Sequence, residues 1–329
     1  MNKLLLAVSL LFPCSSVFAG PACGGVKQLF FSPDNRYFAA LWGDSGNIIS
    51  FGTYKDRKFH RSVNLRSPCL YAISPDSKRV AASLQLENKL LMLSLNGEML
   101  QVIEAGSVLA VSKKFNYVAT SGSELDDRIL TVHSFSGGRL SPVFKLSGMA
   151  DIGLVEFSPD ERFLAYEYSR AANNGRFYVQ FMNVIDLKTG RSAAQFSAPD
   201  GGNSQITALY FSPDSKMLVY GSEIGTVRLL STKDWKTVRT IKGSGPAAAV
   251  IRVSNSGAQM AVMYWAGTRE INIYSMPGFK LIHSEGYGPG LSDIEFSHDS
   301  KELGVLFSNG KLNFLNLGRL AAKTVDGER

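Results

Sequence analysis

Short apolar segments recur along the chain, and each is followed by a turn signature. Seven times an alternating apolar segment ends in serine, usually followed by Pro-Asp, and a second apolar segment begins a few residues later. The anchor serines are Ser32, Ser74, Ser112, Ser158, Ser212, Ser254 and Ser297, spaced 42, 38, 46, 54, 42 and 43 residues apart. Proline presets the turn backbone, and aspartate bonds its own main chain there. A period of about 44 residues predicts a seven-bladed β-propeller.

Each repeat also predicts the strands of one blade. In the first repeat, residues 37–42, 48–54 and 59–65 follow the anchor as the second, third and fourth strands. The first three strands are largely apolar, as expected for sheets covered on both faces by neighbouring blades. In the last repeat, residues 319–325 are the only candidate for a fourth strand. We therefore expect an all-β fold of seven four-stranded antiparallel blades.

The N-terminus has the pattern of a cleavable signal peptide. Lys3 supplies a short positive region, residues 4–12 are apolar, and Val17-Phe18-Ala19 precedes a cleavage point before Gly20. We expect a signal peptide over residues 1–19, one propeller domain over residues 20–329, and export to the periplasm or out of the cell. A lipoprotein anchor on Cys14 is a weaker alternative, because Phe12-Pro13 fits a lipobox poorly.

Removal of the signal peptide leaves two cysteines, Cys23 and Cys69. An even pair in an exported protein predicts one disulfide. The positions favour it, because Cys23 lies just before the first strand of blade one and Cys69 lies at the start of that strand in blade two. Neighbouring blades bring these strand starts together on one face. The alternative is two free buried thiols. No later segment has the pattern of a transmembrane helix, so we expect no integral membrane segment after cleavage.

Composition narrows the class of partner. Hydrophobic residues make up 45% of the chain and charged residues 19%, which excludes a disordered or coiled-coil protein. The net charge of +7 is spread along the sequence, without a basic stripe for nucleic acid. An anionic glycan or lipid headgroup stays an alternative partner on charge alone.

The repeat resembles that of the WD-repeat propellers. The resemblance covers about residues 26–325, and it rests on Phe-Ser-Pro-Asp, the following Leu-Ala-like strand, and Asp186-Leu187-Lys188-Thr189-Gly190 after a third strand. Two family features are missing: the Trp-Asp dipeptide of the third strand and the Gly-His pair before the first. The resemblance therefore implies a propeller whose blades depend more on packing than on the buried hydrogen-bond network of regular WD blades. The Ser-Pro-Asp pattern is also similar to that of periplasmic TolB-like propellers.

Catalytic and metal signatures are sparse, so we expect a non-catalytic protein without a cofactor. The four histidines, His60, His133, His283 and His298, show no metal-ligand spacing, and His298 takes the proline position of an anchor turn. The alternative is a hydrolase or lyase acting at the channel mouth. An enzyme should show facing His, Arg or Asp side chains at one mouth; a scaffold should show an exposed aromatic patch without perturbed acids.

One face of the propeller should carry the binding loops. The turns between second and third strands share a face with the links between blades, and binding residues concentrate on such loops. Trp42 and Trp265 end second strands beneath this face, and Arg170, Arg176 and Tyr287 fall in its loops. These residue types are common hot spots. We expect a monomer that binds a protein or peptide here, although both tryptophans could instead serve packing between blades.

Overall fold

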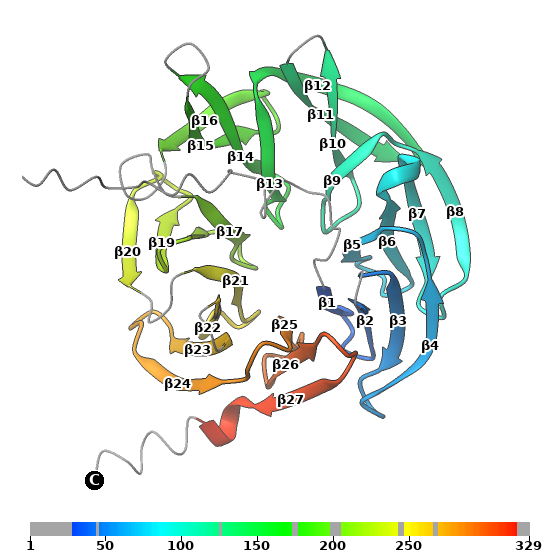
Figure 1. The fold of residues 1–329 in the computed structure, drawn as a ribbon, viewed down its shortest axis with the longest axis vertical. Coiled ribbons are helices and arrows are strands. Elements are labelled where there is room, and N and C mark those ends of the chain that lie inside the picture. Colours follow the sequence, from blue (N-terminus) through cyan, green and yellow to red (C-terminus); the bar gives the residue numbers. More distant parts are fainter. Residues whose placement is uncertain are drawn as a thin grey trace, which may run out of the picture.

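Seven antiparallel sheets surround a central axis, each with its first strand innermost (Figure 1). The structure is a computed structural model that describes residues 28–43, 46–124, 127–172, 177–197, 205–242, 247–265 and 269–320. Strand order within every sheet follows the chain, so each blade is a simple meander. The predicted all-β fold and the seven blades are confirmed.

The strands fall into seven consecutive groups. Blade 1 has β1 (Gln28–Phe31), β2 (Tyr37–Trp42), β3 (Ile48–Thr53) and β4 (Lys58–Asn64); blade 2 has β5 (Pro68–Ile73), β6 (Arg79–Leu84), β7 (Lys89–Ser94) and β8 (Met99–Glu104); blade 3 has β9 (Ser107–Val111), β10 (Tyr117–Glu124), β11 (Asp127–Ser136) and β12 (Arg139–Met149). Blade 4 has β13 (Asp151–Phe157), β14 (Phe163–Ala172), β15 (Phe177–Asp186) and β16 (Arg191–Ser197); blade 5 has β17 (Ile206–Phe211), β18 (Met217–Ser222), β19 (Thr226–Ser231) and β20 (Thr237–Lys242). Blade 6 has β21 (Ala248–Val253), β22 (Gln259–Trp265), β23 (Arg269–Ser275) and β24 (Leu281–Gly286), and blade 7 has β25 (Leu291–Phe296), β26 (Glu302–Phe307) and β27 (Leu312–Asn316).

Blade 7 departs from the predicted four strands. Within the described residues its sheet has three strands, and residues 317–320 form a helical turn after β27. The prediction of a fourth strand is therefore wrong where it would begin, at Arg319 and Leu320. The physical reason is local: Asn316 Oδ1 accepts the Arg319 N–H at 3.1 Å, which starts a helical turn in the manner of an N-cap. Residues 321–325 lie outside the described residues.

Each anchor serine is buried, and its hydroxyl closes the turn. All seven are at most 1% exposed. In every blade the serine Oγ accepts, at 2.9–3.0 Å, the N–H of the residue five positions later, where the second strand begins. In five blades the same hydroxyl donates to the aspartate two positions later at 2.5–2.7 Å. The serines thus occupy equivalent positions because each satisfies a buried main-chain donor that would otherwise be costly.

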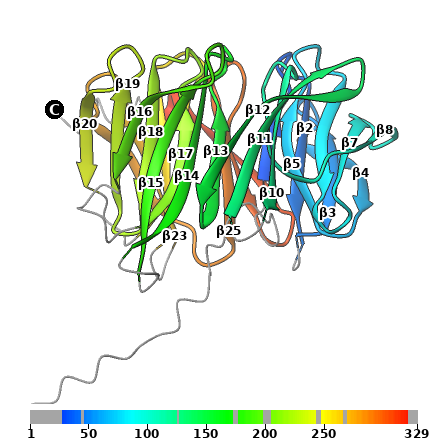
Figure 2. The ribbon, with the colours of Figure 1, turned by 90° about the horizontal axis from the view of Figure 1, so that it is seen from above.

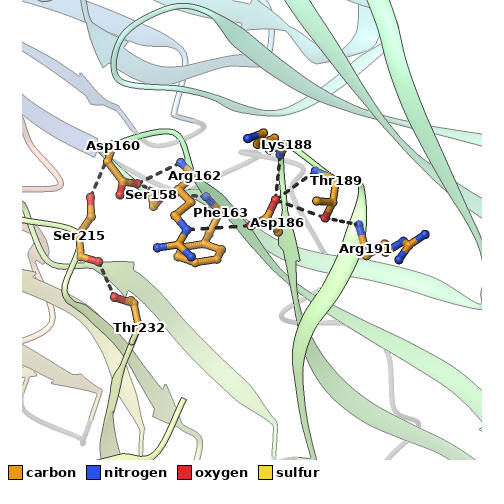
Figure 3. Close-up of polar contacts among 10 residues, drawn as sticks. All are labelled: Ser158, Asp160, Arg162, Phe163, Asp186, Lys188, Thr189, Arg191, Ser215 and Thr232. Carbon is orange, nitrogen blue, oxygen red and sulfur yellow. Dashed lines mark hydrogen bonds and ion pairs between the residues drawn. The ribbon is translucent and has the colours of Figure 1, made fainter. Parts of the chain in front are cut away.

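Anchor turns also bond to one another around the ring. Figure 3 shows the contact between blades 4 and 5, where the Asp160 N–H donates to Ser215 Oγ at 2.9 Å. The Asp34 N–H donates to Ser77 Oγ at 3.1 Å in the same way between blades 1 and 2. Between blades 7 and 1 the His298 N–H donates to Asn35 Oδ1 at 3.0 Å, which confirms the turn role predicted for this histidine.

The turn after β15 shows how the WD-like segment is used. Asp186 Oδ1 accepts the N–H groups of Lys188 and Thr189, both at 3.0 Å (Figure 3). Arg162 Nε lies 4.0 Å from Asp186 Oδ2, so this turn forms an ion pair with a residue that follows the anchor turn of blade 4. Aspartate here forms a turn rather than the network of a regular WD blade.

Aliphatic and aromatic side chains fill the space between blades. The largest fully buried ones include Tyr168, Tyr220, Tyr264, Phe38 and Phe211. Burial of each such side chain contributes roughly 1.5–3 kcal/mol. Stability therefore depends mainly on packing between the blades, as the missing WD features imply.

The junction between blades 7 and 1, called here the closing junction, has a composition of its own. Glu302 of β26 is 6% exposed, and its carboxylate accepts from Arg57 Nη2 at 2.8 Å and from the Tyr54 hydroxyl. The Leu29 N–H donates to Asp293 Oδ2 at 2.7 Å. Around these groups lies an aromatic cluster, with ring centroids 5.2–6.4 Å apart, made of Phe31, Phe38, Tyr54, Phe59 and Phe314.

Two hairpins have longer strands than the others. β10 and β11 pair as far as Glu124 and Asp127. β14 and β15 pair as far as Ala172 and Phe177, so Arg170, which was expected in a loop, lies in a strand. The main-chain pairing of these hairpins continues into polar residues of low strand propensity, which the apolar sequence pattern did not mark. Among the residues that the structure describes, no helix has the length and apolar character needed to cross a membrane.

Candidate functional site

The strand order places the predicted loops on one face. In a meander of four strands, the turn between the second and third strands is on the side where the fourth strand exits toward the next blade. The side view of Figure 2 separates this loop-rich face from the face of the short anchor turns. Trp42 and Trp265 are the last residues of β2 and β22, so both end at the loop-rich face, as predicted.

Trp265 offers the most accessible aromatic surface on this face. Its side chain is 36% exposed, and the guanidinium of Arg269 lies 5.1 Å from the ring centroid. Arg269 is itself held by a hydrogen bond from Nη1 to the Leu291 carbonyl. The indole and the guanidinium are therefore presented as one unit by the paired ends of β22 and β23.

Tyr287 lies next to this pair, but it is less free than the sequence suggested. Its N–H donates to the Arg269 carbonyl at 2.8 Å, and its ring packs 6.2 Å from that of Phe307 in blade 7. The hydroxyl donates to Glu285 at 2.6 Å. Tyr287 is thus part of the packing between blades 6 and 7, because β26 ends with an aromatic residue beside it.

Trp42 completes the series from the other side of blade 7. Its ring rests on Gly310, where an added Cβ would be 2.8 Å from the indole, and its Nε1 donates to Ser50 Oγ at 2.8 Å. Gly310 follows Phe307 in the turn before β27 and bonds back to its carbonyl at 2.9 Å. We call the set Trp265, Arg269, Tyr287, Phe307 and Trp42 the aromatic band. Three predicted binding residues are therefore brought together across blades 6, 7 and 1.

The two predicted arginines do not join the band. Arg170 lies on β14 of blade 4, where it pairs with Val179, and its exposed side chain is 5.2 Å from the Tyr168 ring. It is a strand residue, not the loop residue that was expected. Arg176 lies outside the described residues. Blade 4 is across the ring from blade 7 (Figure 1).

Only one cysteine of the predicted disulfide, Cys69, lies within the described residues. Cys69 is fully buried at the start of β5, and the amide of Gln85 donates to its Sγ at 3.4 Å. Cys23 lies outside the described residues, as do residues 1–19 of the predicted signal peptide and Cys14. The bridge stays a prediction, which mass spectrometry of the exported protein under non-reducing conditions would check.

A second site, absent from the sequence-based prediction, lies in the channel. The residues two positions before the anchor serines form a ring on the innermost strands. In blade order they are Phe30, Ala72, Ala110, Glu156, Tyr210, Arg252 and Glu295. In blades 1 to 3 this position carries apolar residues that pack in the cores between blades, whereas in blades 4 to 7 it carries ionisable ones. Their position places the ring at the anchor-turn end of the channel.

Lys113 joins this ring from the anchor turn of blade 3. Its Nζ lies 5.3 Å from the Tyr210 ring centroid, and the Arg252 guanidinium lies 5.6 Å from the same centroid. Arg252 Nε donates to Glu295 at 2.7 Å and its Nη2 to Asp293 at 3.4 Å. We call Lys113, Glu156, Tyr210, Arg252, Asp293 and Glu295 the channel cluster.

The acids of the channel cluster have perturbed pKa values. Burial raises the pKa of Glu156 to about 7, against the opposing effect of Lys113 and Arg252. Burial likewise raises the pKa of Asp293 to about 6 despite Arg252. Burial lowers the pKa of Lys113, but the nearby acidic groups outweigh it and the pKa is raised overall. Such perturbed groups concentrated in one place are typical of functional sites.

Sequence reasoning missed this cluster although part of its signal was present. The sequence places an ionisable residue two positions before the anchor serine in four successive repeats. These residues are Glu156, Tyr210, Arg252 and Glu295. The histidines did not indicate the channel cluster, because they lie on outer strands or in turns. Among the described residues, no group of three or more His, Cys, Asp or Glu side chains could hold a metal ion.

Comparisons with known proteins agree with the fold. No protein-family model matches the chain. The U3 small nucleolar RNA-associated protein 13 of Saccharomyces cerevisiae is 27% identical over 116 residues, which are 35% of this chain and 14% of the yeast protein. The chain thus matches far less than two thirds of that relative's length.

A solved structure matches over nearly the whole chain. It is the hydrazine synthase of Kuenenia stuttgartiensis, with a TM-score of 0.66 and 16% identity, over 92% of this chain and 96% of that one. At this identity the likeness shows the fold alone. The similarity to TolB-like propellers stays a prediction, and the chain is a seven-bladed β-propeller.

Proposed function

We propose that this protein is an exported interaction scaffold that binds a protein or peptide through the aromatic band of its loop-rich face. A propeller fold is compatible with this role, and the band consists of the residue types that dominate protein interfaces. Export follows from the signal-peptide pattern of residues 1–19 and would place the band in the periplasm or outside the cell.

The observation that carries the proposal is the exposure of Trp265. A tryptophan that is 36% exposed, and stacked with Arg269, keeps apolar area available at the edge of a rigid sheet. A partner that covered this indole would remove that area from water without any loss of backbone freedom in the scaffold. The adjoining Tyr287 and Trp42 extend the surface but are already half-buried.

The test compares Trp265→Ala with Lys216→Ala. Lys216 lies in an anchor turn on the opposite face, and its side chain is 82% exposed. Wild-type and variant proteins, purified from the exporting compartment, would be compared for capture of the partner found with wild type. Loss of the indole should weaken capture by about 1–2 kcal/mol, and loss of Lys216 should leave it unchanged. Equal capture by wild type and Trp265→Ala would contradict the proposal.

Export has a separate test. The mature protein recovered from the periplasm or medium should begin near Gly20, as read by N-terminal mass spectrometry. A protein recovered only from the cytoplasm with residues 1–19 intact would contradict this part of the proposal.

A second candidate function is an enzyme that acts in the channel. The channel cluster supports it, since it gathers Arg252, Asp293 and the perturbed Glu156 where the alternative hypothesis expected a cluster. Hydrolase and lyase substrates would be screened with wild type and Glu156→Gln. Turnover that is lost in Glu156→Gln would favour this candidate over the scaffold.

A further inference from the structure

We propose that the outer edge of β27 binds an extended acidic peptide of another protein, which pairs with it as the fourth strand of blade 7. We call this edge, over Leu312–Asn316, the open edge. It lies at the rim of the ring and is separate from the aromatic band, so the inference goes beyond the proposed scaffold site.

The argument begins with the strand count of blade 7. In the other six blades, the third strand pairs on its outer side with a fourth strand. Within the described residues β27 pairs with β26 alone, and it is the outermost strand of its blade (Figure 1). An unpaired strand edge is a template for another strand, and extended peptides commonly bind proteins in this way.

The register of blade 7 identifies the main-chain groups that face the open edge. The Leu317 N–H donates to the Lys301 carbonyl at 2.9 Å, so position 317 faces β26. Successive residues of an antiparallel strand direct their main-chain groups to opposite sides. The N–H and C=O groups of Leu312, Phe314 and Asn316 therefore point outward.

Blade 5 shows what these groups bond to in a complete blade. There Thr232 is the equivalent of Leu317, because its N–H donates to the Lys216 carbonyl at 2.9 Å. The preceding residue, Ser231, donates its N–H to the Lys236 carbonyl, just before the fourth strand, at 2.9 Å. The outward-facing groups of β27 thus have the positions that pair with a fourth strand elsewhere in the ring.

The side chains of β27 are accessible where those of a complete blade are covered. Leu312 and Phe314 are half-buried. The residues in their places in blade 5, Val227 and Leu229, are fully buried. A strand bound at the open edge would therefore remove apolar area from water in addition to forming main-chain hydrogen bonds.

The neighbouring blades limit what can reach the open edge. Blades 6 and 1 each have a fourth strand, β24 and β4, and neighbouring strands of a sheet lie about 4.8 Å apart. The open edge is thus set back from the rim by one strand on both sides. The same edge of a second copy would be set back as well, so the two edges could not meet, whereas a single extended segment can enter.

The charges beside the open edge favour an acidic segment. Lys311 lies just before β27 and Arg319 three residues after it; both are exposed, and among the described residues neither forms an ion pair. The nearest acid, Glu302, already accepts from Arg57 and Tyr54. Two cations are therefore available to pair with acidic side chains at the two ends of a bound strand.

The probe peptide follows from this geometry. Fluorescently labelled acetyl-Glu-Val-Thr-Val-Thr-Val-Glu-amide, antiparallel to β27, places its glutamates near Arg319 and Lys311 and its central valine opposite Phe314. The N–H of that valine then faces β27, whereas the N–H groups of the threonines face solvent. Fluorescence anisotropy with the mature full-length protein should detect binding.

Three altered peptides test the mode of binding. N-methylation of the central valine removes a hydrogen bond to β27 and should weaken binding at least about tenfold. N-methylation of a threonine, the matched control, should change binding by less than about threefold. A peptide with lysine in place of both glutamates should bind at least about tenfold more weakly.

Protein variants and hydrogen exchange locate the site. Lys311→Glu and Arg319→Glu should each weaken binding of the acidic peptide by about threefold or more. Lys188→Glu is the control, because Lys188 is an exposed lysine in the turn before the fourth strand of blade 4. It should change binding by less than about twofold. The bound peptide should also slow hydrogen exchange at the amides of Leu312–Asn316.

Three results would overturn the proposal. They are no binding of the acidic peptide to the folded wild-type protein, equal binding of the peptide methylated at the central valine, and unchanged hydrogen exchange in β27 when the peptide is bound. An open edge already covered by another segment or a second copy of this chain would give the first result. Trp265→Ala should bind the peptide like wild type, so failure of the scaffold proposal would be distinguishable from failure of this one.

Discussion

Two junctions of the ring are stabilised by different interactions. Between blades 4 and 5, Asp160 bonds to Ser215 in the anchor turns (Figure 3). This bond accompanies a core of residues such as Phe211, Leu218 and Tyr220. The closing junction keeps a similar turn bond. It adds the Glu302 ion pair and the aromatic cluster.

The difference follows from the path of the chain. Blades 4 and 5 are consecutive, whereas blades 7 and 1 are at opposite ends of the sequence and must be joined without covalent continuity. Contacts such as the hydrogen bond from the Leu29 main-chain N–H to the Asp293 carboxylate connect residues 264 positions apart. Contacts of high sequence separation form at an entropic cost, so this junction needs stronger contacts than its neighbours.

The largest expected effect tests whether aromatic packing closes the ring. Phe38→Ala and Phe211→Ala each remove a fully buried ring, one at the closing junction and one between blades 4 and 5. Both should lower the free energy of unfolding by about 3–5 kcal/mol. Only Phe38→Ala should speed hydrogen exchange at the Leu29 amide before global unfolding. The same exchange pattern in both variants would remove the distinction between the junctions.

A smaller effect is expected at the ion pair between the buried Glu302 and the half-exposed Arg57. Glu302→Ala should lower the free energy of unfolding by about 2 kcal/mol, because it leaves Arg57 and Tyr54 without their shared acceptor. Glu124→Ala, which breaks an exposed pair with Lys145, should cost less than about 0.5 kcal/mol in the same chemical denaturation experiment. Similar values for both would show that Glu302 contributes no more than a surface charge.

The closing junction should also respond to pH. Burial raises the pKa of Asp293 to about 6, with Arg252 opposing and Glu295 reinforcing the shift. The folded state therefore binds the Asp293 proton more tightly than the unfolded state does. The resulting gain in the free energy of unfolding is present below the ordinary pKa of 3.8 and is lost as the pH rises through about 6. Between pH 4 and 7, wild type should lose roughly 2 kcal/mol of stability relative to Asp293→Asn.

Denaturation curves of the two proteins at several pH values would measure this difference. Glu156 shifts in the same direction in both proteins, so their difference isolates Asp293. A constant difference across the range would contradict the assignment.

The smallest effect is expected at the hydrogen bond between anchor turns, which both junctions share. Asn35 and Ser215 have φ values of 55° and 59°, and each accepts a main-chain N–H from the neighbouring blade. Replacement by glycine removes that hydrogen bond but also the cost of the left-handed backbone. Asn35→Gly and Ser215→Gly should each change thermal stability by less than about 1 kcal/mol, and by similar amounts. A clearly larger loss in one would mean that the turn bonds also differ between junctions.

The sequence predicted the repeat well because its signal is local. Each anchor serine satisfies an N–H only five positions away, so the same short pattern recurs wherever that turn is built. The end of blade 7 was not predicted because one side chain, Asn316, redirects the chain into a helical turn.

The candidate sites were predicted less well for a different reason. Trp42, Trp265 and Tyr287 were identified by residue type, but their connection through Phe307 and Gly310 depends on how blades 6, 7 and 1 pack. Contacts across the channel depend on the closed ring, and no spacing along the chain encodes them.

The contact between Lys113 and Tyr210 has an evolutionary consequence. Because it reaches from blade 3 to blade 5, it depends on the angle that one intervening blade occupies in a ring of seven. Repeat proteins commonly gain and lose units by duplication and deletion of one repeat. Here such an event between these blades would separate the lysine from the tyrosine, although every remaining blade could still fold. The contact thus depends on the number and order of the repeats, whereas each anchor serine bonds within its own repeat.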